Sequence, residues 1–134
     1  GTDTALAMAM LSVIINEDLY DHEYVDYWCY GFDELKARIN DPEKGMTAAR
    51  AAEICDIPEE KIVEAARMYA QAKPASISWG LAIDQKANGM QAGQCILDLM
   101  AITGNIDVPG GNVLGDVTSS TRWVSASRRV SAIS

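Results

Sequence analysis

The feature that most constrains this chain is the stretch from Thr4 to Leu19, which is apolar on nearly every side of a helix and follows Asp3, a plausible N-cap. A helix of this kind must be covered all round. We therefore expect a sheet against one side and other helices against the rest, which is more covering than 134 residues can easily supply. The stretch thus indicates that partner segments of a larger protein are missing.

Further along the chain, hydrophobic periodicity and capping residues predict shorter helices. Thr47 is expected to cap one of them, Pro58 to be the first residue of another, and Asn88 to cap a long helix that Gly104 ends in the left-handed conformation. The expected helical ranges are Asp21 to Cys29, Phe32 to Ile39, Thr47 to Cys55, Pro58 to Ala72 and Met90 to Thr103.

Residues Ala75 to Trp79 are the one convincing strand candidate, and Gly80 opens a polar turn after them. Helix, strand, glycine turn and helix in that order are typical of a βα unit. We therefore expect a fragment of a wound, Rossmann-like α/β cofactor-binding domain that is helix-rich with a small parallel sheet. It would cover residues 1–115, and residues 116–134 would form a Ser/Thr-rich tail of unknown role.

Composition excludes several classes of protein. A net charge of −8 argues against nucleic-acid binding, which relies on Lys and Arg to neutralise phosphates. No apolar stretch reaches the roughly 18 residues that a membrane span needs. Cys29, Cys55 and Cys95 lie far apart beside a single histidine, His22, so a zinc or iron–sulfur site made by this chain alone is improbable. We expect buried thiols and a surface-exposed His22.

Three loops carry polar or small residues next to a helix end. The first is Gly1-Thr2-Asp3, where the carboxylate could accept two N–H donors at once, as the N1 and N2 edge of guanine offers, or could serve only as a cap. The second is Trp79 to Gly89, which lies where wound α/β folds bind ligands, although a plain connection is the more common use. The third is the glycine-dense run Thr103 to Asn112, either a connection or a shaped binding loop. The sequence has no Ser-His-Asp set, metal-ligand cluster or P-loop lysine motif.

Taken in order, these segments resemble the molybdopterin oxidoreductases of the DMSO reductase type, which carry bis(molybdopterin guanine dinucleotide). The resemblance covers residues 1 to about 115. Its motifs are Gly1-Thr2-Asp3-Thr4-Ala5-Leu6-Ala7, Ile14-Ile15-Asn16-Glu17-Asp18-Leu19-Tyr20-Asp21, Gly31-Phe32-Asp33-Glu34, Trp79-Gly80 with Asp84-Gln85, Met100-Ala101-Ile102-Thr103-Gly104-Asn105-Ile106, and Pro109-Gly110-Gly111.

The resemblance implies that Thr2 and Asp3 bind the guanosine end of one dinucleotide and that Gly80 and Gln85 line the same cleft. The molybdenum ligand, the iron–sulfur cluster and the domain that holds the second dinucleotide would lie outside this segment, so the isolated chain is expected to be inactive. The parent would move two electrons, and usually an oxygen atom, to or from a small substrate. A free-standing helical interaction module with no cofactor is the alternative.

The resemblance also implies partners. These would be the remaining domains of the parent catalytic subunit, with iron–sulfur and membrane-anchor subunits as further candidates. From its charge and hydropathy we expect this segment neither to bind nucleic acid nor to insert into a membrane. Because covering segments are missing, we also expect an exposed apolar surface and self-association. The compartment stays open, since relatives work outside the cytoplasmic membrane as well as inside it.

Overall fold

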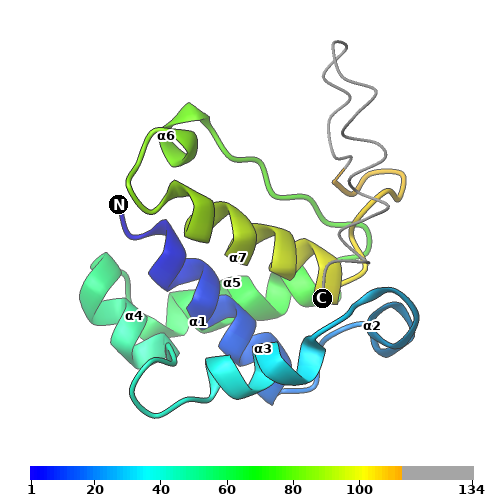
Figure 1. Cartoon of the computed structure of the whole chain (residues 1–134), viewed down its shortest axis with the longest axis horizontal. Helices are drawn as coiled ribbons and strands as arrows, with labels where there is room; N and C mark the ends of the chain where they lie inside the picture. The colour runs from blue at the N-terminus through cyan, green and yellow to red at the C-terminus, as the bar shows by residue number, and fades with distance from the viewer. Residues whose placement is uncertain (113–134) are drawn as a thin grey trace.

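The computed structural model describes residues 1–112, and within them the fold is helical, with seven helices and no strand (Figure 1). The expected wound α/β fold with a parallel sheet is therefore wrong for the described residues. The expected tail, residues 116–134, lies outside them. The helices are α1 (Asp3–Asn16), α2 (His22–Trp28), α3 (Phe32–Ile39), α4 (Ala48–Cys55), α5 (Glu59–Gln71), α6 (Leu81–Asp84) and α7 (Gly89–Ile102).

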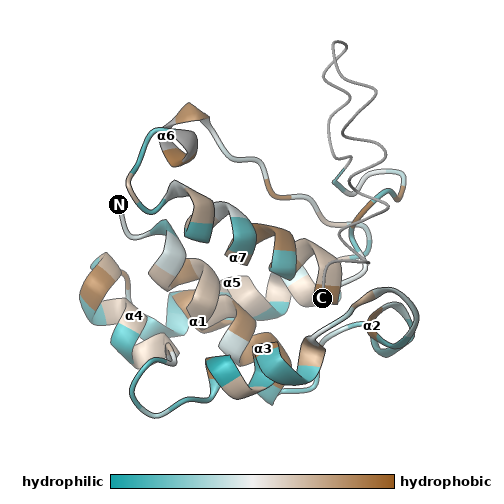
Figure 2. Ribbon diagram, viewed as in Figure 1, coloured by the Kyte–Doolittle hydropathy of each residue, from teal (hydrophilic) through white to brown (hydrophobic). Residues whose placement is uncertain are grey.

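Helix α1 lies at the centre and packs against α4, α5 and α7 (Figure 1). Leu11 and Ile14 of α1 are fully buried. Figure 2 shows white and brown ribbon along much of α1, which reflects its apolar character. Other helices of the chain bury most of α1, whereas Leu6, Met8 and Met10 stay partly exposed, so the predicted cover on every side is incomplete within the described residues. The expectation of a sheet against one side failed because α5 and α7 occupy the space beside α1.

Small side chains let these helices approach one another closely. Ala9 of α1, Ala51 of α4 and Ala66 of α5 have no exposed surface, and Ala92 of α7 is almost fully buried. Interhelical distance depends on the side chains at the contact, so alanine at each helix face favours tight packing. The helices α4 and α5 contact each other and both lie against α1.

The predicted strand is extended but has no neighbouring strand in the described chain. Instead, asparagine side chains satisfy its backbone. The N–H of Ala75 donates to Asn105 Oδ1 at 3.0 Å. The N–H of Ile77 donates to Asn112 Oδ1 at 2.8 Å, and its carbonyl accepts from Asn112 Nδ2 at 2.7 Å. The strand prediction was wrong because a side-chain amide, which offers both a donor and an acceptor, takes the part of a second backbone.

The capping predictions had mixed outcomes. Asp21 and Thr47 accept the N–H groups of Tyr24 and Arg50, as expected of N-caps. Asp3, however, is the first residue of α1 and not its cap, a position that Thr2 occupies without a side-chain hydrogen bond. Pro58 precedes α5 by one residue, and Asn88 stands at the cap of α7 but bonds elsewhere. Gly104 is left-handed, with a φ of 66°, as predicted.

None of the helices in the described chain is long and apolar enough to cross a membrane. The three cysteines are free thiols, and each is partly buried, whereas the sequence analysis expected them to be buried. His22 is exposed, as predicted, and lies 3.3 Å from Asp18.

Candidate functional site

Two of the three predicted loops meet at one end of the helical core. Lys86 Nζ, in the loop after α6, donates to Asp3 Oδ2 at 2.9 Å. Asn88 Nδ2 lies 3.3 Å from Thr4 Oγ1 and 3.4 Å from the carbonyl oxygen of Gly1. The polar contacts therefore join the start of α1 to the segment that leads into α7, although more than 80 residues separate them in the sequence.

The helices explain why this end suits polar ligands. Helices α1 and α7 both begin here, and the short α6 lies above them (Figure 1). The first N–H groups of a helix have no intrahelical partner, and the helix dipole places partial positive charge at this end. Two helix N-termini and a lysine thus lie at this end of the core. Their positive charge favours the binding of anions and of hydrogen-bond acceptors there.

Asp3 is the most distinctive side chain of this end, which we call the α1/α7 N-terminal end. Its carboxylate is 40% exposed and faces Lys86, which is 33% exposed. The hydrogen bond from Lys86 is the main cause that holds the pKa of Asp3 below its usual value, and the same bond raises the pKa of Lys86. Both groups are therefore charged at neutral pH, and Asp3 is available as an acceptor.

Thr2 is exposed beside Asp3. Its carbonyl oxygen accepts the N–H of Leu6 at 3.1 Å and lies 3.7 Å from the thiol sulfur of Cys55 at the end of α4. Because its side chain makes no capping hydrogen bond, its hydroxyl is not committed to the helix. Thr2 thus contributes an exposed hydroxyl next to the carboxylate.

Gly80 and Gln85 flank α6 on the surface of the same loop. Gly80 has an ordinary φ of −107°, and a Cβ built on it meets no atom of the described chain within 4 Å. Neither backbone strain nor packing against the described residues requires glycine there. Gln85 is exposed at the C-cap of α6. The loop therefore brings Lys86, next to Gln85, onto Asp3, while among the described residues no hydrogen bond joins Gly80 or Gln85 to Thr2 or Asp3.

Sequence reasoning missed Lys86. It placed Asn88 correctly at the N-cap of α7, but the Asn88 side chain makes no capping bond there. A signal for Lys86 existed, because it is the one cation between Ala75 and Asn112. A single lysine in a loop between two apolar segments, next to a predicted site residue, could have been paired with the carboxylate of Asp3. No local pattern could identify the contacts of Asn88 with Gly1 and Thr4, since they depend on how α1 and α7 pack.

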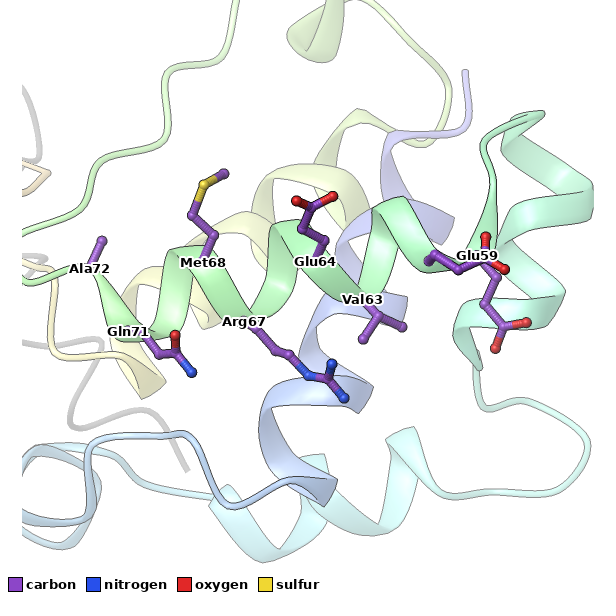
Figure 3. Close-up of a pocket in the computed structure, with 8 residues that line it drawn as sticks. Glu59, Val63, Glu64, Arg67, Met68, Gln71 and Ala72 are labelled. Carbon is purple, nitrogen blue, oxygen red and sulfur yellow. The ribbon is translucent and has the colours of Figure 1, made fainter.

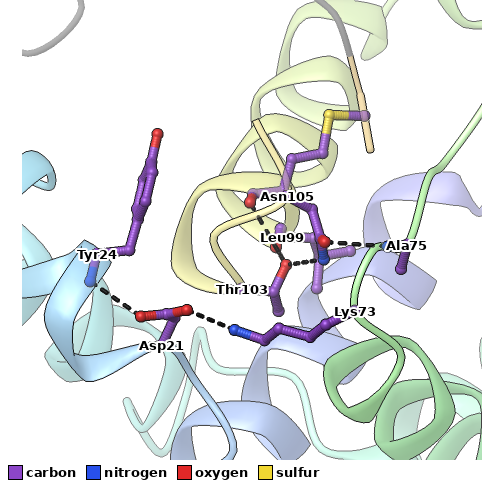
Figure 4. Close-up of polar contacts among 8 residues, drawn as sticks. Asp21, Tyr24, Lys73, Ala75, Leu99, Thr103 and Asn105 are labelled. Atoms are coloured by element: carbon purple, nitrogen blue, oxygen red, sulfur yellow. Dashed lines mark hydrogen bonds and ion pairs between the residues drawn. The ribbon is translucent and has the colours of Figure 1, made fainter. Parts of the chain in front are cut away.

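The third predicted loop, Thr103 to Asn112, lies at the opposite end of α7 and forms a buried hydrogen-bond network (Figure 4). Thr103 and Asn105 are 0% and 1% exposed. Thr103 Oγ1 donates to the carbonyl of Leu99 at 2.7 Å and accepts from Asn105 Nδ2 at 2.9 Å. Lys73 pairs with Asp21 at the edge of this network. The partners of Thr103 and Asn105 are internal, so the geometry favours a structural connection over a binding loop.

Figure 3 shows an open groove along α5. Three glutamates, Val63, Met68 and Arg67 are among its lining residues, and Arg67 is already held by Glu17 through hydrogen bonds of 2.7 and 2.8 Å. The groove contains none of the predicted site residues. In the described part of the chain no three His, Cys, Asp or Glu side chains are grouped so that they could hold a metal ion.

Comparison with known proteins identifies relatives of the chain. No protein-family profile matches it. It is 44% identical over 117 residues to the acetylene hydratase of Syntrophotalea acetylenica. This match covers 86% of the chain but only 15% of the hydratase. It is 35% identical over 127 residues to the dimethyl sulfoxide reductase DmsA of Haemophilus influenzae, covering 84% of this chain and 16% of the reductase.

A solved structure agrees. The acetylene hydratase from Pelobacter acetylenicus superposes with a TM-score of 0.77 at 43% identity, over 86% of this chain and 15% of that one. The chain thus spans about 15% of the length of the relatives it matches. Sequence and structure together confirm the resemblance found in the motifs: this chain is homologous to one segment of the DMSO reductase family of molybdopterin enzymes.

Proposed function

We propose that this chain is a cofactor-binding segment of a molybdenum enzyme's catalytic subunit. In this proposal the guanosine end of one molybdopterin guanine dinucleotide lies at the α1/α7 N-terminal end. The observation that carries the proposal is the convergence of the Gly1–Asp3 segment and the Gly80–Gly89 loop on the Asp3–Lys86 pair. The family of the relatives uses the bis(molybdopterin guanine dinucleotide) molybdenum cofactor.

The donor set fits such a ligand. Asp3 is an ionised carboxylate that can accept the two N–H groups of a guanine edge. Thr2 offers a hydroxyl and Gln85 an amide for the ribose or base, and Gly80 leaves room for close approach by a ring or phosphate. Lys86 supplies a cation for a phosphate group. These five roles are proposals that rest on residue chemistry and on the shared end of the fold.

We propose that the segment positions the cofactor and takes no part in the chemical reaction. When bound, the molybdenum cofactor would supply the redox chemistry of the parent, whereas the residues described here would hold its nucleotide end. The names of the relatives include a hydratase, a sulfoxide reductase and a formate dehydrogenase. Since the substrates differ while the segment is shared, we infer that it carries the common cofactor and that substrate choice is made elsewhere. We expect the isolated chain to be inactive.

The partners follow from the same proposal. The remaining domains of the parent subunit would cover the surface around α1, α6 and α7, and iron–sulfur and membrane-anchor subunits are further candidates. The iron–sulfur cluster would be held outside this segment. Self-association of the isolated chain remains our expectation, because large apolar side chains such as Leu81 and Met90 are exposed near the proposed site.

One observation favours a second function. Tyr27, Trp28 and Tyr30 are all largely exposed around the end of α2, on a different part of the molecule from Asp3. Exposed aromatic side chains are enriched at protein interfaces. A helical interaction module that binds a partner through α2 and needs no cofactor is therefore the alternative.

The test of the first proposal is Asp3→Asn in the full-length parent enzyme. Loss of one carboxylate oxygen as an acceptor should weaken guanine binding by about 1.5–3 kcal/mol, so guanine nucleotide and molybdenum per chain should fall after purification. Asp26→Asn, an exposed acid on α2, is the matched control and should leave both contents unchanged. Unchanged cofactor content and activity in Asp3→Asn would remove this site assignment.

A further inference from the structure

Lys86 already occupies one of the two oxygens that a guanine edge would need. Its ammonium group donates to Asp3 Oδ2 at 2.9 Å, and the two side chains are only 33% and 40% exposed. A base that hydrogen-bonds through two parallel N–H groups needs both carboxylate oxygens in one plane. Ligand binding at Asp3 therefore requires Lys86 to leave Oδ2 or to share it.

If a neutral nucleoside displaced the ammonium group of Lys86 from Asp3, the positive charge of Lys86 would lose its anionic partner. Helices α1 and α7 both point their N-termini at this end, so the local partial charge is positive. Lys86 is also the one cation between Ala75 and Asn112, so its loop contains no second positive side chain that could take over its role. A ligand that brings its own anion would provide Lys86 with a new partner at the moment its bond to Asp3 is given up.

We propose that Lys86 is the phosphate-binding and positioning residue of this site, exchanging its bond with Asp3 for a bond with the phosphate of a guanine nucleotide. The inference rests on the proposed function and deepens it by naming the ligand class: a guanine nucleotide that carries a phosphate group, with the base on Asp3 and the phosphate on Lys86. Asn88, bonded to Thr4 and Gly1, keeps the loop in place while the lysine side chain changes partner.

The flexibility of the lysine stem makes this exchange possible. Lysine has a long, rotatable side chain with a compact charge, so its ammonium can move several ångström without a change in the backbone. The Asp3–Lys86 pair in the free chain then serves as a placeholder that keeps both charges compensated. Specificity follows, because a ligand gains full binding only when it offers donors to Asp3 and an anion to Lys86 together.

The experiment is a titration of the 134-residue chain with GDP, guanosine and ADP up to about 10 mM, followed by amide chemical shifts. We expect GDP to bind about tenfold more tightly than guanosine, since it adds a charge-assisted contact. Lys86→Met keeps the apolar stem and should reduce this preference to less than about threefold, without weakening guanosine. Lys86→Arg should retain the preference for GDP.

Controls separate this role from a structural one. Lys61→Met breaks a comparable exposed lysine–glutamate pair on α5 and should leave the GDP preference unchanged. Asp3→Asn should weaken guanosine but not remove the preference for a phosphate. If Lys86→Met perturbs the amide spectrum beyond its own loop, Lys86→Gln replaces it, and the same loss of preference is expected.

The outcomes distinguish the two proposals. Guanosine binding that depends on Asp3 together with an unchanged GDP preference in Lys86→Met would overturn the role of Lys86 and leave the proposed function standing. Absence of GDP binding at about 10 mM, or binding that Asp3→Asn does not alter, would overturn both. In the full-length parent, Lys86→Met should also lower the guanine nucleotide bound per chain, and unchanged content there would contradict the assignment to the cofactor.

Discussion

The helical core ends in two polar regions that differ in burial and in how their hydrogen bonds are shared. At the C-terminal end of α7, Thr103 and Asn105 are 0% and 1% exposed and bond to neighbouring backbone and to each other. At the α1/α7 N-terminal end, Asp3 and Lys86 form one partly exposed ion pair. The same short chain therefore carries a closed polar network and an open one.

The difference indicates which region can bind a ligand. Breaking a buried, satisfied network leaves donors and acceptors without partners and is strongly unfavourable, so it fixes the chain in one arrangement. An exposed ion pair contributes only about 0–1 kcal/mol and can exchange partners easily. We therefore regard the Thr103–Asn112 loop as structural and the Asp3–Lys86 region as the place where a ligand can enter.

The largest effect is expected for Asn105→Ala, which attacks the closed network. The substitution leaves the N–H of Ala75 and the hydroxyl of Thr103 without their amide partner and opens a small cavity. We expect the free energy of unfolding to fall by about 2–4 kcal/mol. Urea unfolding of the 134-residue chain measures it. A loss below about 0.5 kcal/mol would show that the hydrogen bonds of Asn105 contribute little to stability, and the two polar regions would then not differ as described.

The next effect compares two glycines, one in each region. Gly104 has a φ of 66°, and a Cβ there would lie 2.9 Å from Asp21 Oδ2, so Gly104→Ala should destabilise the chain by about 1–2 kcal/mol. Gly80→Ala meets no atom of the described chain within 4 Å and should change stability by less than about 0.5 kcal/mol. Thermal unfolding of both variants checks this. Equal destabilisation would mean that Gly80 is structural as well.

Asp98, on α7 between the two regions, supplies a pH-dependent test. Burial raises the pKa of its carboxyl group to about 6, from a usual value of 3.8. The folded chain therefore holds this proton more tightly than the unfolded chain, and the contribution of Asp98 to stability is lost as pH rises from about 4 to about 6. Because Asp98 is only partly buried, we expect a loss of about 1–2 kcal/mol across this interval.

Asp98→Asn removes the titrating group and should remove its contribution to the pH dependence of stability. The variant should also be more stable than the parent chain above pH 6, because an amide carries no charge to desolvate. Unfolding midpoints measured at about pH 4 and about pH 7 for both chains give the comparison. If the midpoints of the two chains change by the same amount between these two pH values, Asp98 does not cause the expected pH dependence.

The smallest effect on stability is expected for the Asp3–Lys86 ion pair. Lys86→Met should change the free energy of unfolding by no more than about 1 kcal/mol, as expected for a partly exposed ion pair. Arg67→Met, which breaks the exposed pair with Glu17, is the matched control and should behave similarly. Urea unfolding in low and high salt checks both variants. A loss above about 2 kcal/mol for Lys86→Met alone would make the pair structural and unsuited to exchange.

Much of the helical structure could be predicted because helices depend on local pattern. The range of α3 was correct, and the ends of α1, α4, α5 and α7 were found within three residues, since periodicity and caps such as Thr47 act over a single turn. The presence of a sheet could not be predicted from local pattern. A strand needs a partner from elsewhere in the chain, and at Ile77 that partner is the side chain of Asn112.

The candidate site was predicted in part for the same reason. Asp3 stood out as a carboxylate at the start of an apolar helix, but its observed role in the free chain, the ion pair with Lys86, joins residues more than 80 positions apart. Such a contact depends on the packing of α1 against α7. The expectation that Asp3 is a cap was wrong because α1 begins one residue earlier than predicted, with Thr2 in the cap position.

Binding of a guanine nucleotide at the Asp3–Lys86 region is tested most directly by mapping where GDP perturbs the backbone amides of the chain. We predict that the shifts concentrate at Thr2 to Thr4 and at Gly80 to Gly89, while the Thr103–Asn112 loop and the groove on α5 stay unchanged. Shifts confined to the groove or to the closed network, or no shifts at all, would contradict the account.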